Sequence, residues 1–166
     1  MKNVLIAVIS ALIAAACLSA CEDGNKKIAD NTAQEEYYTQ TSMSALEYKM
    51  YLANKISVAV GQLSTHMAKI QNVAGGSCSF EDEIDALEIA IKTLKDDRKD
   101  MTYVYPPDSY SSTRENALQY WQDAIDKMQE MSDFLDGKIL SAEKALEFST
   151  DLKDIYTSIQ SLNFSV

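Results

Sequence analysis

A stripe of apolar residues recurs at every third or fourth position between residues 117 and 135, and this pattern constrains the fold more than any other. Residues at this spacing lie on one face of an α-helix, because one turn contains about 3.6 residues. A helix with one apolar face must bury that face against other elements. The stripe therefore predicts an amphipathic helix in a packed core. Its members are Ala117, Trp121, Ala124, Met128, Met131 and Leu135.

Three more segments have apolar residues at helical spacing, and no segment shows the sustained alternation of a β-strand. The chain has only five glycines and two prolines, so few residues interrupt these helices. The pattern predicts an all-α fold, an antiparallel up-down four-helix bundle, with a three-helix core and a loosely attached leading segment as the alternative. The further stripes are Ala53, Ile56, Val60, Leu63, Met67 and Ile70; Phe80, Ile84, Leu87, Ile91 and Leu94; and Ala145, Phe148, Leu152, Ile155, Ile159 and Leu162.

The first helix has two alternative starting points. Thr32 and Glu35 have the spacing of a capping box, in which the hydroxyl accepts a backbone N–H and the carboxylate reaches back. The apolar spacing is irregular before residue 45, so a break at 42–44 is the alternative. A helix unbroken from residue 32 would be longer than the other three, and would overhang or bend. We expect residues 45–72 to form the part that packs in the bundle.

Capping residues and helix breakers predict the remaining helix ends. A serine hydroxyl accepts a free N–H of the first turn, glycine closes a helix readily, and proline lacks the amide hydrogen that a helix needs. The predicted ends are Gly75-Gly76 for the first helix, Ser79 and Pro106-Pro107 for the second, the window 108–112 and Gly137 for the third, and Ser141 for the start of the fourth.

The acidic composition limits the classes of partner. The chain has 15 Lys and Arg against 25 Asp and Glu, a formal net charge of −10. Such a surface repels phosphate groups. We therefore expect no nucleic acid partner.

The N-terminal residues have the three parts of an export signal. Lys2 supplies the basic start, residues 4–16 are uncharged and largely apolar, and small residues precede Cys21. An ordinary secretory cleavage site or an uncleaved membrane anchor would be alternative interpretations, since the apolar segment is close to the shortest length that spans a bilayer. The strongly polar residues directly after Cys21 favour cleavage.

This N-terminal segment resembles the signal peptides of bacterial lipoproteins. Their lipobox of Leu, a small residue, Ala or Gly, and Cys is matched by Leu18, Ser19, Ala20 and Cys21 at every position. The resemblance implies cleavage between Ala20 and Cys21 and attachment of diacylglycerol to the Cys21 thiol. Cys17 follows a poorer match that lacks the leading Leu. The resemblance covers only residues 1–21, and no specific family is recognised for the mature domain.

The resemblance also implies a domain organisation and a location. We expect a signal peptide at 1–20, the lipidated Cys21 with a polar tether at 21–31, and a helical domain at 32–166. The protein would lie outside the cytoplasm, in the bacterial cell envelope, held to a membrane through Cys21. Residues 22 and 23 do not decide between the inner and the outer membrane. In the mature chain only Cys78 would remain as a thiol, either buried singly or paired between chains.

The sequence predicts no enzyme, cofactor or metal site. His66 is the only histidine, so the chain lacks the paired Glu-x-x-His of di-iron bundles and the ligands of a zinc cluster. There is no Gly-x-Ser-x-Gly nucleophile motif. Asp126, Glu130 and Asp133 share a helix face and could collect calcium, but a solvated acidic face is the simpler interpretation. The acidic groups at 81–83 and 95–100 are likewise expected to be solvated.

Tyr103, Tyr105 and Tyr110 surround Pro106-Pro107 and are the candidate partner-binding residues. Aromatic rings beside rigid prolines offer large contact areas at low entropic cost. The alternative is that the rings cover the open end of the core. In an up-down bundle this connection lies at the same end as the N-terminus of the bundle, and so near the membrane.

Two functions from different classes follow from this sequence. The first is a non-enzymatic, lipid-anchored bundle that binds another envelope component as an adaptor, accessory subunit or inhibitor. The second is a carrier of a small molecule or of copper in the bundle interior near His66 and Met67, where imidazole and thioether would be the ligands.

Overall fold

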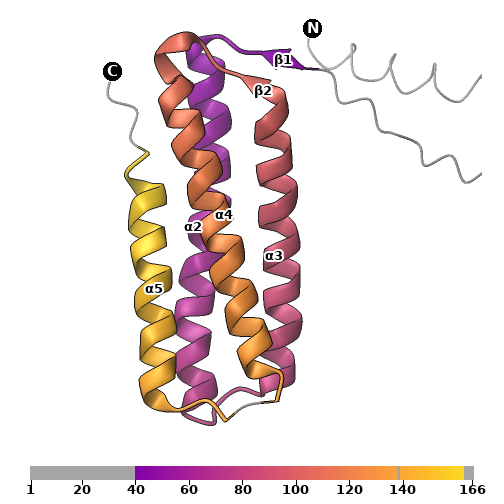
Figure 1. The fold of residues 1–166 in the computed structure, drawn as a ribbon, viewed down its shortest axis with the longest axis vertical. Helices are drawn as coiled ribbons and strands as arrows, with labels where there is room; N and C mark the ends of the chain where they lie inside the picture. Colours follow the sequence, from indigo (N-terminus) through magenta and orange to yellow (C-terminus); the bar gives the residue numbers. More distant parts are fainter. Residues whose placement is uncertain (1–39, 138, 163–166) are drawn as a thin grey trace, which may run out of the picture. The chain divides into compact units, whose positions relative to one another are not determined.

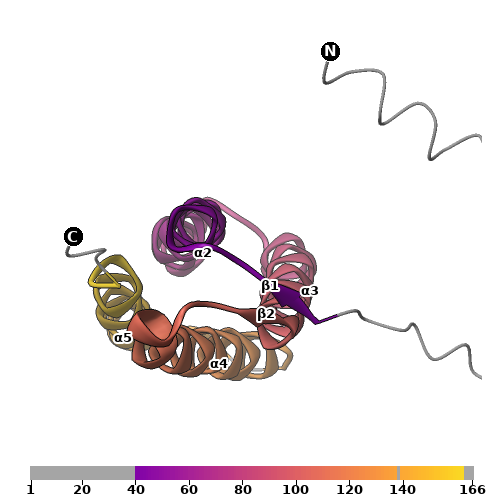
Figure 2. The same cartoon turned by 90° about the horizontal axis from the view of Figure 1, so that it is seen from above.

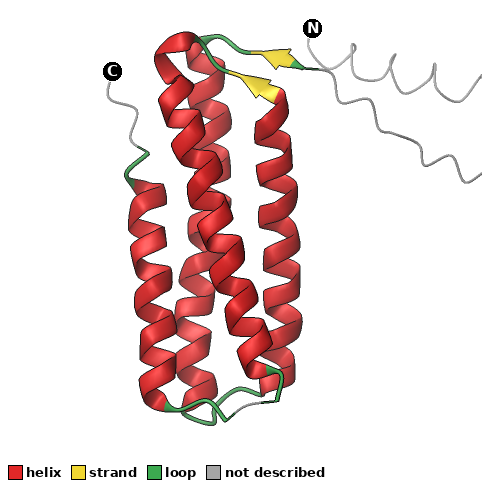
Figure 3. Cartoon of the chain, in the orientation of Figure 1, coloured by secondary structure: helices red, strands yellow, loops and turns green. Residues whose placement is uncertain are grey.

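The computed structural model describes residues 40–137 and 139–162, and four long helices dominate them (Figures 1 and 3). Helices account for 83% of these residues, which confirms the all-α class. Each of the two strands has only two residues. The helices are α2 (Ala45–Ala74), α3 (Phe80–Tyr103), α4 (Ser111–Leu135) and α5 (Ala142–Gln160). The predicted start at Thr32, the tether and the signal peptide lie outside the described residues.

The four helices lie side by side around a common interior (Figures 1 and 2). The turns from α2 to α3 and from α4 to α5 lie at the lower end in Figure 1, and the connection from α3 to α4 lies at the upper end. Each helix contacts its sequence neighbours, and α2 also contacts α5. Short connections explain the contacts between consecutive helices, because they bring each helix back alongside the one before it.

The helix ends follow local capping chemistry. Ser44 precedes α2, and its hydroxyl accepts the Glu47 N–H at 3.4 Å while its own N–H donates to the Glu47 carboxylate at 2.9 Å. This capping box confirms the alternative start, with a break at 42–44. Ser79 and Ser141 cap α3 and α5 as predicted. Helix α2 ends at Ala74, directly before the predicted Gly75-Gly76, and so includes the residues 45–72 expected to pack in the bundle.

The turns after α2 and α4 use glycine for a backbone conformation that other residues rarely adopt. Gly76 has φ +72° and Gly137 has φ +97°, as predicted from their positions after helical segments. Helix α4 begins at Ser111, inside the predicted window, but Tyr110 rather than a serine occupies its N-cap position. A 3-10 helix, η1 (Asp108–Tyr110), leads directly into α4 and removes the need for a side-chain cap.

The core confirms the stripe of α4, all of whose members are buried. The stripe of α5 is also buried, apart from the half-buried Ile155. Apolar residues on these two helices were therefore sufficient to identify the inward face.

The stripes predicted for α2 and α3 were partly wrong. On α2, Ala53 is exposed, whereas Tyr48, Leu52 and Ala59 are buried, so the inward face is rotated from the predicted one. On α3, Phe80 is 36% exposed. The physical reason on α2 is that apolar residues also occupy neighbouring positions, so apolar spacing alone does not decide which of two adjacent lines faces the core. Phe80 is the first residue of α3, at the end of the bundle.

Two short strands were not predicted. β1 (Thr41–Ser42) pairs in parallel with β2 (Val104–Tyr105), Thr41 with Val104 and Ser42 with Tyr105. The N–H of Met43 continues the ladder with a hydrogen bond to the carbonyl of Tyr105 at 3.1 Å. Segments of this length are too short to show an alternating pattern, and their pairing depends on the helices that bring them together.

Candidate functional site

The structure brings the three predicted tyrosines to one end of the domain, where α3 ends and α2 and α4 begin (Figure 1). Tyr103 is the last residue of α3, Tyr105 lies in β2, and Tyr110 ends η1. Strand β1, which leads into α2, lies alongside Tyr105. The described N-terminal segment and the tyrosine-rich connection therefore share this end.

Tyr110 packs against the core and is only partly exposed. Its ring is half-buried and lies 5.7 Å from the ring of Tyr48, centroid to centroid. Tyr48 is only 2% exposed. Tyr103 is also half-buried. Tyr110 therefore matches the alternative interpretation, in which the rings cover the end of the core.

Tyr105 is the tyrosine of the three that offers most surface, with 42% of the residue exposed. The Arg114 guanidinium lies 5.2 Å from the centroid of its ring, and its hydroxyl accepts a hydrogen bond from Gln40 at 3.2 Å. Arg114 is itself fixed, because it donates to the carbonyls of Met101 at 3.2 Å and Thr102 at 2.8 Å in the last turn of α3. A rigid ring stacked on a guanidinium is a common form of protein contact surface.

Below this end, a polar cluster joins α2 to α3. Lys55 Nζ lies 2.5 Å from Asp97 Oδ1 and 3.0 Å from Asp100 Oδ2. Burial alone would lower the pKa of Lys55, but its hydrogen bonds to Asp97 and Asp100, together with the charge of Asp97, raise the pKa above the usual range. Asp97 was expected to be solvated. That expectation was wrong, since its side chain is only 13% exposed.

Burial also changes the chemistry of two tyrosines on α2. It raises the pKa of both Tyr48 and Tyr51 to about 12. The nearby Arg114 and Lys55 charges, respectively, act in the opposite direction but do not cancel the effect of burial. Both hydroxyls therefore stay protonated at any physiological pH.

A second polar group lies in the interior near the other end. His66 Nδ1 lies 2.6 Å from Glu83 Oε1, and the two residues are 1% and 0% exposed. Lys69 Nζ approaches the other carboxylate oxygen at 3.6 Å. Glu83 was assigned to a solvated first turn from the sequence, and this was wrong.

A signal for this pair was present in the sequence. Glu83 precedes Leu87 by four residues, and His66 lies between Leu63 and Ile70 at helical spacing. Each polar residue thus continues the buried line of its own helix. A buried pair is indicated when an acidic residue and a histidine each occupy a core position and their helices are joined by a short turn.

His66 and Met67, the residues of the alternative copper site, differ in burial. The Nδ1 atom of His66 contacts Glu83, so only its Nε2 atom could bind a metal, and Met67 is half-buried. Across residues 40–137 and 139–162, no three His, Cys, Asp or Glu side chains are grouped closely enough to hold a metal ion. Cys78 is a free, half-buried thiol.

The acidic face of α4 engages neighbouring side chains. Asp126 and Asp133 accept hydrogen bonds from Gln122 and Gln129 at 2.8 and 2.9 Å. Glu130 pairs with Lys127. These contacts within one turn are typical of a solvent-facing helix surface.

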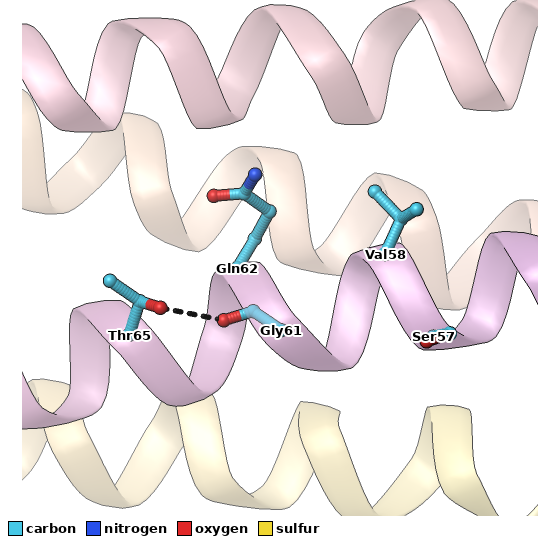
Figure 4. Close-up of a pocket in the computed structure, with 5 residues that line it drawn as sticks. All are labelled: Ser57, Val58, Gly61, Gln62 and Thr65. Atoms are coloured by element: carbon cyan, nitrogen blue, oxygen red, sulfur yellow. Dashed lines mark hydrogen bonds between the residues drawn. The ribbon is translucent and has the colours of Figure 1, made fainter.

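A shallow hollow lies on the outer face of α2 (Figure 4). Its lining includes Gly61, whose carbonyl accepts a hydrogen bond from the Thr65 hydroxyl at 2.9 Å. This face was not predicted from the sequence. Its lining residues are Ser57, Val58, Gly61, Gln62 and Thr65.

Cys21, the predicted lipidation site, lies outside the described residues. Among the described helices, none combines the length and apolar character needed to cross a membrane. Comparison with known proteins yields no matching family, no similar curated protein and no similar solved structure.

Proposed function

We propose that this protein is a lipid-anchored, extracytoplasmic helical bundle without enzymatic activity, which binds another component of the bacterial cell envelope. It would act there as an adaptor, an accessory subunit or an inhibitor. The observation that carries the proposal is the complete lipobox at Leu18-Ser19-Ala20-Cys21. A doubly acylated protein stays at the membrane surface, whereas one acyl chain alone gives only marginal binding.

We also propose that the four helices form an antiparallel up-down bundle. Three features support this assignment: short connections, turns that alternate between the two ends, and buried stripes on all four helices (Figure 1). Bundles of this kind cross at about 20°. Side chains fill such an interior, so we expect a partner to bind on the surface of the bundle.

The surface that we propose for the partner surrounds Tyr105 and Arg114. It combines an exposed aromatic ring, a fixed guanidinium and the paired strands β1 and β2. Because β1 belongs to the segment nearest the proposed anchor, this end of the bundle would face the membrane. A partner at this surface would itself be embedded in the membrane or attached to it.

The anchor can be tested by labelling with radioactive palmitate in bacterial cells that produce the full-length protein. Cys21→Ser should abolish labelling and release the protein from the membrane fraction. Cys17→Ser is the matched control and should leave both unchanged. Loss of label in Cys17→Ser with retention in Cys21→Ser would reject Cys21 as the anchor.

The partner can be tested by chemical crosslinking in intact cells, followed by mass spectrometry of the captured proteins. Tyr105→Ala should reduce capture of a specific envelope protein at least tenfold. Ile89→Ala is the control, since Ile89 is also exposed, at 68%, but lies on the outer side of α3. Equal capture by the parent and Tyr105→Ala would reject this surface.

A further inference from the structure

Helix α2 differs from the rest of the chain in charge. Residues 48–80 contain no Asp or Glu, although the chain has 25 of them. The only acidic residue of α2 is Glu47, in its first turn, where it completes the capping box. The charged residues that follow on this helix are Lys49, Lys55 and Lys69. Lys55 and Lys69 face carboxylates of α3, so the outside of α2 carries little charge although the protein is acidic.

An uncharged stripe runs along the exposed side of this helix. Its residues are separated by three or four positions, and so they share one face. Leu46 and Met50 are 68% and 67% exposed, unusually high values for large apolar side chains. The stripe consists of Leu46, Met50, Ala53, Ser57, Gly61, Ser64 and Ala68, all of them exposed.

Gly61 marks a place where another backbone can approach. A glycine inside a helix costs stability relative to alanine. Internal packing does not require this one, because a Cβ atom at Gly61 would meet nothing within 4 Å. Gly61 instead lines the hollow on the outer face of the helix, with the residues drawn in Figure 4. Small residues at such a position allow two helices to pack closely.

The stripe is symmetric about Ser57. The intervals between successive members of the stripe are the same on either side of Ser57. The large residues lie at one end of the stripe and the small residues at the other. An antiparallel copy of the same stripe would set each large residue against a small one. The pairs would be Leu46 with Ala68, Met50 with Ser64, Ala53 with Gly61, and Ser57 with Ser57.

We propose that this face of α2 binds the same face of a second copy of the protein, antiparallel, with a twofold axis beside Ser57. A twofold interface uses one patch twice and is the commonest arrangement in protein oligomers. The charge distribution favours this patch, since other faces would bring acidic groups of two copies together. This inference rests neither on the lipid anchor nor on the surface around Tyr105. The antiparallel pair sets the Tyr105 ends of the two copies at opposite ends, so the membrane-facing orientation proposed above would hold for one copy of the pair and for the unpaired protein.

Cysteine crosslinking of the full-length protein tests the pairing directly. All variants carry Cys78→Ser, and this parent measures any background dimer. Ser57→Cys should form a disulfide-linked dimer under mild oxidation, because the axis places the residue beside its own copy. Ser112→Cys, at an exposed position of α4, is the control and should stay at the parent level.

Two further variants establish the direction of the helices. Met50→Cys and Ser64→Cys, produced together with different tags, should give a mixed dimer and little of either dimer alone. A Met50→Cys dimer formed in preference to the mixed one would overturn the antiparallel arrangement. Failure of Ser57→Cys to exceed the parent, or its crosslinking to a protein of different mass, would overturn the proposal.

Gly61→Glu tests the contact in a second way. Added to Ser57→Cys, it should reduce the disulfide dimer at least tenfold, because two carboxylates would face the partner helices. The open space at Gly61 allows the monomer to fold, which circular dichroism and thermal unfolding would verify. Ser112→Glu is the matched control. An undiminished dimer in Gly61→Glu would contradict a close contact at this position.

Discussion

His66 and Glu83 form a buried pair between α2 and α3, with 2.6 Å between Nδ1 and Oε1. Glu83 is completely buried and His66 is 1% exposed. Removing a carboxylate from water costs several kcal/mol, about as much as good partners return. The pair therefore contributes less to net stability than to the register of the two helices, since any slip would leave a buried charge without its partner.

Substituting one member of this pair should lower the stability of the domain far more than substituting both members together. His66→Leu or Glu83→Leu alone is expected to lower the free energy of unfolding, by about 3–5 kcal/mol where the remaining partner stays charged and buried. The double substitution should recover most of this loss. Urea unfolding measures all three, with Glu81→Leu, at an exposed neighbouring position, as the control. Additive losses in the double variant would contradict the pairing.

Alkaline pH should destabilise the domain through Tyr48. Its pKa is raised from 10.0 to about 12 by burial, so the folded state favours the protonated hydroxyl. The stabilisation is complete below pH 10 and is lost as the pH rises toward 12. Tyr48→Phe should therefore reduce the loss of stability over this interval, as measured by urea unfolding at several pH values. An unchanged slope would rule out this contribution.

Lys55 should contribute more to stability than an ordinary surface lysine. Its removal leaves the largely buried Asp97 without its cation, so Lys55→Met is expected to cost about 1.5–3 kcal/mol, the usual range for hydrogen bonds to charged groups. Lys95→Met, at an exposed position of α3, is the control and should change stability by less than about 0.5 kcal/mol. Equal effects of the two substitutions would indicate that the Lys55 cluster is dispensable.

Substitution by alanine should change the stability of the domain in opposite directions at Gly61 and at Gly76. Gly61 lies within α2 with free space around it, so Gly61→Ala should stabilise the monomer by about 0.5–1 kcal/mol. Gly76 has φ +72°, where a side chain is strained, so Gly76→Ala should destabilise by about 1 kcal/mol. Thermal unfolding at low protein concentration compares them. A destabilising Gly61→Ala would mean that the helix needs glycine for internal reasons.

The sequence was informative where one physical effect dominated. The apolar spacing from Ala117 to Leu135 identified the inward face of α4, because the buried positions of that helix are apolar apart from Ser132. Ser79 and Ser141 were identified as caps because capping depends on only a few neighbouring residues. Such local effects can be recognised without knowledge of the tertiary structure.

The features that escaped prediction depend on contacts between distant residues. Thr41 pairs with Val104 only after α2 and α3 have brought the two segments together. The inward position of Glu83 likewise depends on His66, from another helix, to make burial of its carboxylate tolerable. The three tyrosines lie at one end of the domain, but their different exposures depend on neighbours such as Tyr48 and Arg114.

Mass spectrometry of the N-terminal tryptic peptide from the membrane-extracted protein is the most direct test of the proposed role at the membrane. The expected peptide begins at Cys21, ends at Lys26 and carries diacylglycerol on the cysteine sulfur. A peptide with an unmodified Cys21 thiol, or one in which residues before Cys21 are still attached, would contradict the lipid anchor and with it the proposed location.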